Sequence, residues 1–164
     1  MLKKGYTLVE LLVVILIMGI FLQLGFTSLR DFSRRQAAFS AARQVEGDIR
    51  FAQSLALSGN KPEGSVCDNI NALFNGVRFQ ILTATSYEIS TECSTGRAVI
   101  KTVTIDSNIS LRSPSVNPII FRPLARGTNV PTQTTIGVCT YAAGVGIQVT
   151  NSGEINQVSY SSCP

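Results

Sequence analysis

Residues 3–22 read KKGYTLVELLVVILIMGIFL: two lysines and a glycine lead into an apolar run that contains a single acid, Glu10. Counted over residues 6–26, the run is about 21 residues long, enough for a helix to cross a hydrocarbon layer about 30 Å thick. The two lysines favour a cytoplasmic N-terminus, because positive charge beside the first span sets its orientation. The stretch therefore predicts a single-pass membrane helix with the rest of the chain outside the cytoplasm.

The unusual residue of this stretch is its acid. A carboxylate within a membrane span costs on the order of 2.5–3.5 kcal/mol, and no lysine or arginine lies between Gly5 and Arg30 to pair with Glu10. Cleavage between Gly5 and Tyr6 would create an amino terminus of opposite charge at that depth. The alternative is an uncleaved anchor with a tolerated glutamate. A conventional signal peptide fits less well, because the apolar run is long and no A-x-A-like site follows it.

The same residues resemble the class III signal of type IV pilins and type II secretion pseudopilins, which has a short basic leader ending in glycine, an aromatic first mature residue and glutamate at the fifth position. Gly5, Tyr6 and Glu10 stand at those positions. The resemblance implies that residues 1–5 are a leader cleaved by prepilin peptidase. It also implies N-methylation of Tyr6 and assembly into a filament, with an inner-membrane assembly platform and other pilin or pseudopilin subunits as partners.

Glu10 and the amino group of Tyr6 form the assembly site that we expect. A buried carboxylate and a buried ammonium attract each other strongly, whereas either one left alone is penalised by several kcal/mol. In a staggered array, Glu10 of an entering subunit can meet the Tyr6 amine of its neighbour, which sets the register of assembly. Glu10 can also interact favourably with the dipole at the N-terminus of its own helix, and this role is compatible with the first.

The predicted helix continues beyond its apolar half, residues 6–28, into an amphipathic half, residues 29–57. No proline precedes Pro62, and Ser58-Gly59 supplies a helix end. Apolar residues recur at spacings of three, four or seven, as on one face of a helix: Phe32, Phe39, Ala42, Val45, Ile49, Ala52 and Ala56. Charged residues are expected on the opposite face: Arg30, Arg34, Arg35, Arg43, Asp48 and Arg50.

Residues 58–164 are predicted to form an antiparallel β head. Alternating apolar and polar residues separated by turn residues indicate about seven short strands: 76–82, 86–90, 98–105, 118–123, 134–139, 145–150 and 154–160. Residues 151–153, Asn-Ser-Gly, read as a tight hairpin turn between the last two. The expected fold class is α+β, similar to type IV pilins, with sheet packed on the amphipathic half of the helix.

All four cysteines, Cys67, Cys93, Cys139 and Cys163, lie in this exported part, and an even number in an oxidising compartment favours two disulfides. Three pairings are possible. We favour Cys67 with Cys93 and Cys139 with Cys163, sequential pairs that close loops of similar length. No C-x-x-C spacing suggests a metal site.

A second resemblance spans most of the chain. Residues 119–127, 146–149 and 152–155, together with the helix segment 49–56, are similar to GspH/FimT-type minor pseudopilins. Some members of that group bind DNA through a basic Gly-Arg-x-Arg-like turn, whereas this chain has Ser-Gly-Glu-Ile at residues 152–155. Nucleic acid is therefore a weakly supported partner.

Composition excludes several classes of function. The chain contains no histidine, so histidine-based catalysis and histidine metal ligation are impossible, and no nucleophile or phosphate-loop motif occurs. The net charge of +4 falls to +2 without the two leader lysines, and from Ser58 onward seven bases face six acids. We expect no enzyme, no metal and no cofactor.

The resulting hypothesis is a structural subunit, a pilin, minor pilin or pseudopilin, of a type IV pilus or type II secretion pseudopilus. Its precursor is expected in the cytoplasmic membrane and its mature form in a filament at the cell envelope or surface. Two alternatives stay open: a DNA-binding minor pilin for natural transformation, and an uncleaved membrane-anchored binding domain.

Overall fold

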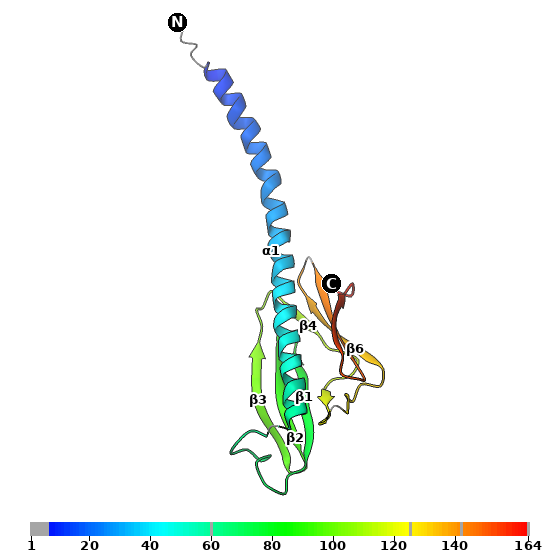
Figure 1. Ribbon diagram of the computed structural model, residues 1–164. Coiled ribbons are helices and arrows are strands. Elements are labelled where there is room, and N and C mark those ends of the chain that lie inside the picture. Colours follow the sequence, from blue (N-terminus) through cyan, green and yellow to red (C-terminus); the bar gives the residue numbers. More distant parts are fainter. Residues whose placement is uncertain (1–6, 60, 125, 142, 164) are drawn as a thin grey trace.

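One helix, α1 (Leu8–Ser58), dominates the computed structural model, which describes the backbone of residues 7–59, 61–124, 126–141 and 143–163 (Figure 1). Side chains are described for these residues except 23–28. At 1.5 Å per residue, the 51 residues of α1 span about 77 Å. The helix begins after Thr7, whose extended backbone and side-chain oxygen cap the first turn, and ends at Gly59, which adopts φ 63°. The predicted end of the helix is confirmed.

Among the described residues, no helix is both long enough and apolar enough to cross a membrane. The membrane-spanning role expected for residues 6–28 therefore stays a prediction.

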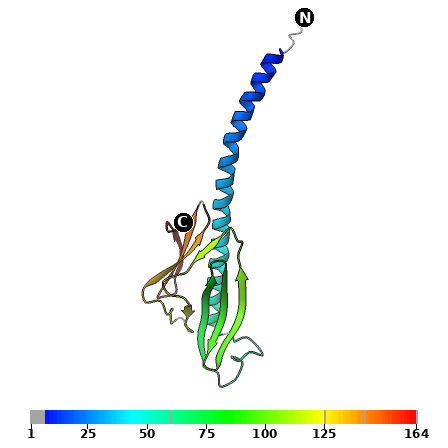
Figure 2. The same cartoon turned by 180° about the vertical axis from the view of Figure 1, so that it is seen from behind.

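Two antiparallel four-stranded sheets form the head, residues 61–163. Sheet A has the order β3-β2-β1-β5 and sheet B the order β4-β6-β7-β8. The strands of sheet A are β1 (Phe74–Thr83), β2 (Ser86–Cys93), β3 (Gly96–Thr104) and β5 (Ile119–Phe121). Those of sheet B are β4 (Ser110–Arg112), β6 (Gln133–Cys139), β7 (Gly144–Thr150) and β8 (Ile155–Ser159). Figures 1 and 2 show sheet A lying along the C-terminal half of α1, with sheet B beside it.

The core lies between α1 and the two sheets, and α1 contacts both of them, chiefly at β1 and β7. The buried face of the helix follows the spacing 4-3-4-3-4 that places residues on one side of an α-helix: Ala38, Ala42, Val45, Ile49, Ala52 and Ala56. Facing strands contribute large buried side chains, including Phe79, Tyr87, Phe121 and Ile147. The α+β fold predicted from the sequence is confirmed.

Three details of the prediction are wrong. Phe32 and Phe39 were expected on the buried face but are 61% and 44% exposed, because the buried face starts at Ala38, one residue around the helix from Phe39. Asp48 was expected on the solvent face and is 9% exposed, because it pairs with groups of sheet A. A short strand, β4, was missed, since three residues carry too little alternation to mark a strand.

Two disulfides close the head, Cys67–Cys93 and Cys139–Cys163, with sequence separations of 26 and 24. This is the pairing that the sequence favoured. In the loop-entropy account each contributes about 3 kcal/mol by restricting the unfolded chain. The hairpin predicted at residues 151–153 is also present, with Gly153 at φ 88° and its N–H donated to the carbonyl of Thr150.

Glycines on sheet B make room for the C-terminal segment that follows β8. A Cβ at Gly137 would overlap the ring of Tyr160, and one at Gly144 would overlap the sulfur of Cys163. Tyr160 therefore lies flat against β6, and the Cys139–Cys163 disulfide holds the segment there. A side chain at either position must displace this segment.

Replacing Gly137 by Ala should lower the free energy of unfolding by about 1–3 kcal/mol, because the added methyl overlaps Tyr160 beside a disulfide that prevents its retreat. The matched control is Gly47→Ala in α1, where a Cβ meets nothing within 4 Å and helix propensity improves stability by up to about 1 kcal/mol. Denaturant unfolding of the full chain in detergent, followed by circular dichroism, measures both. Equal effects of the two variants would contradict the close packing.

Candidate functional site: the helix and its attachment to the head

The first turn of α1 combines a capping threonine with an acid three residues later. Oγ1 of Thr7 accepts a hydrogen bond from the N–H of Glu10 at 3.3 Å, which satisfies one of the free N–H groups at the helix start. Glu10 is exposed in this turn, where the positive end of the helix dipole favours a negative charge. Gly5 and Tyr6 lie outside the described residues, so the cleavage site and its amine remain predictions.

The next turns of α1 are apolar on every side. In residues 8–22 only Glu10 and Gly19 are not large apolar residues, and the exposed fraction of the others ranges from 43% at Val14 to 82% at Leu8. A helix that is hydrophobic all round requires burial by lipid or by other proteins. Burying each of these side chains stabilises an assembly by on the order of 1–2 kcal/mol. The head covers none of them, so this surface is available to a partner.

The other half of α1 is attached to sheet A through Asp48. Its carboxylate accepts a hydrogen bond from the hydroxyl of Tyr87 at 2.6 Å and two from Nζ of Lys101, at 2.7 and 3.0 Å. Tyr87 is completely buried and Lys101 reaches in from the edge strand β3. Burial raises the pKa of the Tyr87 hydroxyl, and the Asp48 carboxylate raises it further, so Tyr87 stays a proton donor to the helix.

The opposite flank of α1 is attached to sheet B by three side chains of the helix. Arg50 donates to Glu46 at 2.8 Å and to the carbonyl of Ile155 at 3.0 Å. Glu46 in turn accepts from Gln157 at 2.6 Å. Gln53 donates to the carbonyl of Gly153 at 2.7 Å. Hydrogen bonds on both flanks therefore fix the rotation of α1 relative to the head.

The hydrogen bonds and charges around Glu46 change the pKa of its carboxyl group. Partial burial opposes its ionisation, but hydrogen bonds from Gln157 and Arg50, together with the positive charges of Arg50 and Arg43, outweigh burial and hold the pKa below its ordinary value. The charged form of Glu46 is thus the one that the folded head favours.

The strand residues that form hydrogen bonds with α1 could not be identified from the sequence. Glu46 and Arg50 could be found as an acid and a base four residues apart. Tyr87, Lys101 and Gln157 have no such local signal, because they lie 39 to 111 residues from their partners on α1. The cap at Thr7 did have a signal, since Thr-x-x-Glu at residues 7–10 has the spacing of a capping box.

The exposed arginines of the helix and of the head do not form one site. Arg30, Arg34, Arg35 and Arg43 are exposed on α1, whereas Arg122 and Arg126 are exposed on the head. At the turn where a DNA-binding relative would be basic, Glu154 accepts a hydrogen bond from Asn156. Within the described part of the chain, no three potential metal ligands come together.

Comparisons with known proteins agree with this arrangement. Residues 1–22 match the prokaryotic N-terminal methylation motif, and residues 41–153, more than half of the chain, match the family described as type II transport protein GspH. The chain belongs to the GspH family. As a member it is a pseudopilin of type II secretion, a structural protein rather than an enzyme, and it assembles with other pseudopilins after processing by prepilin peptidase. No curated protein and no solved structure matches the chain significantly.

In this GspH-family chain, Asp48→Ala should lower the free energy of unfolding by about 2 kcal/mol, because the buried hydroxyl of Tyr87 and the ammonium of Lys101 lose their shared acceptor. Asp31→Ala removes an exposed acid from the same helix and should change stability by less than about 0.5 kcal/mol. Denaturant unfolding of the two full-length variants measures the difference. Similar losses in both would show that Asp48 does not attach the helix.

Glu46 should make the GspH-family chain sensitive to acid. Because the folded state lowers its pKa, the charged form contributes stability at neutral pH, and this contribution is lost as the pH falls below about 4.5. Wild type should exceed Glu46→Gln by less than about 1 kcal/mol at pH 7, since Arg50 is 55% exposed. Unfolding measured from pH 7 to pH 3 should show the difference shrinking, and a difference that grows on acidification would contradict the assignment.

Proposed function

We propose that this chain is made as a single-pass membrane precursor, loses residues 1–5 by cleavage between Gly5 and Tyr6, is methylated at Tyr6, and is assembled through α1 into the type II secretion pseudopilus. The head lies outside the cytoplasm before and after assembly. The disulfides of the head suit that compartment, because oxidising conditions there maintain them.

The observation that carries the proposal is the contrast between the two halves of α1. The half at residues 38–56 presents its apolar face to the head and is buried. The half at residues 8–22 presents apolar side chains in every direction, and no other described residue covers it. A segment of this kind can be buried either in lipid or among parallel helices of the same kind, so one helix serves as both the membrane anchor and the filament core.

Glu10 gives the assembly its register. Between Thr7 and Leu29 it is the only charged residue, so its pairing with a terminal amine is unique within the apolar half. Release of the leader creates that amine on Tyr6 of each mature subunit. The Glu10 carboxylate of an incoming subunit and the Tyr6 amine of a neighbour then neutralise each other where water is absent, and an offset of one residue leaves both unpaired at a cost of several kcal/mol.

The first measurement is the mass of the N-terminal peptide of the protein isolated from cells that assemble it. The expected product begins at Tyr6 and carries one methyl group on its amine. A product that retains residues 1–5 would overturn the proposal in favour of an uncleaved anchor.

A second measurement compares Glu10→Gln with wild type in the same cells. The neutral side chain cannot pair with the Tyr6 amine, so the fraction of chain recovered in sheared filaments should fall at least about tenfold while the amount in the membrane stays unchanged. Asp31→Asn removes a carboxylate from the same helix outside the apolar half and should assemble normally. Normal incorporation of Glu10→Gln would contradict the pairing.

A further inference from the structure

Leu124 departs from two ordinary preferences of its residue type. It adopts a left-handed backbone with φ 57°, and among the described residues it is the only one other than glycine with a positive φ. A leucine is strained in this conformation, where glycine or asparagine is usual. Its side chain is also 75% exposed, so packing within the described part of the head does not offset the strain. Backbone strain of this kind is concentrated at functional sites.

The turn that carries Leu124 projects from an ordered base. The N–H of Arg122 donates to the carbonyl of Gly127 at 2.9 Å, and the N–H of Thr128 donates to the carbonyl of Asn151 at 2.8 Å. Gly127 adopts φ 74°, and a Cβ there would overlap the carbonyl of Asn151. The base of the turn is therefore held against the connection between β7 and β8, so a partner that binds Leu124 has little of it left to order.

Positive charge and a small pocket adjoin Leu124. Arg122 and Arg126 flank it in the sequence, both are exposed, and neither forms a salt bridge with another described residue. A pocket of about 150 Å³ opens beside the base of the turn, where Leu57 of α1 and Phe121 of β5 give it apolar walls. This volume suits one side chain of a partner.

The charge of this surface favours an acidic partner. The turn carries two bases, and the described lining of the pocket contains no acid. Glu154, which follows the lining in the sequence, is exposed, and counting it leaves the surface positive by one charge. A protein with carboxylates around an apolar site would pair with the arginines and also cover Leu124. Nucleic acid phosphates would pair with the arginines alone, so the exposed leucine favours a protein.

The position of this surface separates it from the membrane. Leu57, at its edge, lies near the C-terminal end of α1 (Figures 1 and 2). At 1.5 Å per residue, Leu57 is roughly 50 Å along the helix from Leu22. A bilayer that holds residues 8–22 is therefore out of reach of Leu124.

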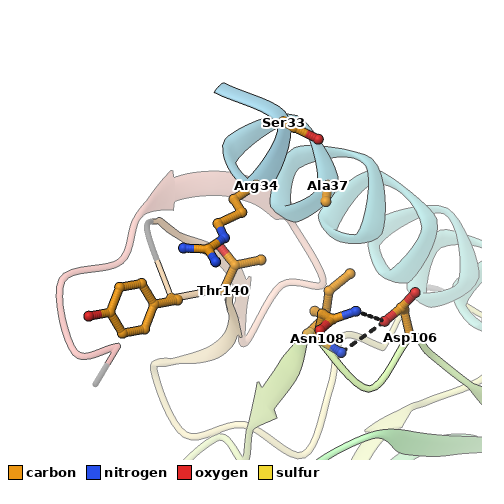
Figure 3. A pocket seen from close by; sticks show the side chains of 8 residues that line it. Ser33, Arg34, Ala37, Asp106, Asn108 and Thr140 are labelled. Atoms are coloured by element: carbon orange, nitrogen blue, oxygen red, sulfur yellow. Dashed lines mark hydrogen bonds between the residues drawn. The ribbon is translucent and has the colours of Figure 1, made fainter. Parts of the chain in front are cut away.

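A second copy of the chain also matches this surface poorly. In the parallel arrangement proposed for the filament, a copy would approach with the opposite end of its head, where α1 leaves it. The pocket at that end, shown in Figure 3, has one base and one acid in its lining, Arg34 and Asp106. Residues 29–37 of α1 beside it carry three arginines and one aspartate. That end offers no net negative charge to the arginines of the turn.

We propose that the surface formed by Leu57, Arg122, Leu124 and Arg126 binds an acidic and apolar segment on the head of a different pseudopilin in the same pseudopilus. Leu124 packs against apolar residues of the partner, the arginines pair with its carboxylates, and the pocket beside Leu57 receives one of its side chains. The family supplies the class of partner, because its members assemble with other pseudopilins. This inference rests on the proposed assembly through α1 and adds a contact made by the head.

Photo-crosslinking from residue 124 tests the contact in cells that assemble the full chain. The photoreactive residue p-benzoylphenylalanine in place of Leu124 should link, on irradiation, to the head of a different protein that has its own N-terminal methylation motif. The linked peptide, identified by mass spectrometry, should contain aspartate or glutamate. The matched control places the same residue at Val99, exposed in the middle of β3, and should not link to that peptide.

Charge reversal tests the pairing of the arginines with the partner. Arg126→Glu should reduce the yield of the link from residue 124 several-fold, and changing an acid of the linked peptide to arginine should restore it. Arg112→Glu makes the same change at an exposed position of β4 and should leave the yield unaltered. An undiminished link in Arg126→Glu, or an equal loss in Arg112→Glu, would overturn the proposal.

An asparagine at residue 124 separates binding from folding. Asparagine tolerates the left-handed conformation, so Leu124→Asn should keep or raise the midpoint of thermal unfolding while it removes the apolar contact. The amount of chain recovered in sheared filaments should then fall several-fold, whereas Val99→Asn should leave that amount unaltered. Normal recovery of Leu124→Asn would overturn the proposal.

The mass of the N-terminal peptide in the same samples separates the remaining outcomes. A processed chain that begins at Tyr6 and gives no link from residue 124 overturns the contact of the head alone. A chain that retains residues 1–5 overturns the proposed function as well. A link to a second copy overturns the choice of partner. So does binding of a short DNA duplex by the full chain in detergent, if Arg126→Glu abolishes it.

Discussion

Ala38, Ala42, Ala52 and Ala56 are almost completely buried, and because their side chains end at Cβ, the axis of α1 can lie close to strands of two different sheets. Larger residues at these positions would hold the helix away from the head and open gaps that the sheets could not fill. Sheet A and sheet B share no strand, so the helix is the element on which both are packed. The head is in this sense built around one face of its own helix.

Packing of small residues alone specifies the rotation of a helix about its axis poorly. Hydrogen bonds on the two flanks of α1 fix this rotation. Asp48 is directed to Tyr87 and Lys101 on one side, and Arg50 and Gln53 bind main-chain carbonyls of sheet B on the other. Turning the helix in one direction leaves the buried hydroxyl of Tyr87 without its acceptor, and turning it in the other breaks the hydrogen bonds of Arg50 and Gln53 to sheet B. The direction in which residues 8–22 leave the head is thereby determined.

Much of this arrangement could be predicted from local patterns. The apolar run, the end of the helix at Gly59, the hairpin at residues 151–153 and the pairing of the cysteines all depend on spacing or on residues with special backbone preferences. The buried face of α1 was harder to predict from the sequence, because alanine is only weakly hydrophobic. The more hydrophobic Phe32 and Phe39 dominated the helical pattern, although both are exposed. The role of Asp48 could not be predicted at all, since its partners are 39 and 53 residues away and nothing local distinguishes it from a solvent-facing acid.

The length of α1 has a mechanical consequence. The helix runs unbroken from Leu8 to Ser58 with only a gentle curve (Figures 1 and 2), and its last 21 residues are fixed in the head. A displacement of its apolar end along the axis is therefore transmitted to the head over the same distance, with no joint to absorb it. A force applied only at the apolar end of such a rod therefore moves the whole head.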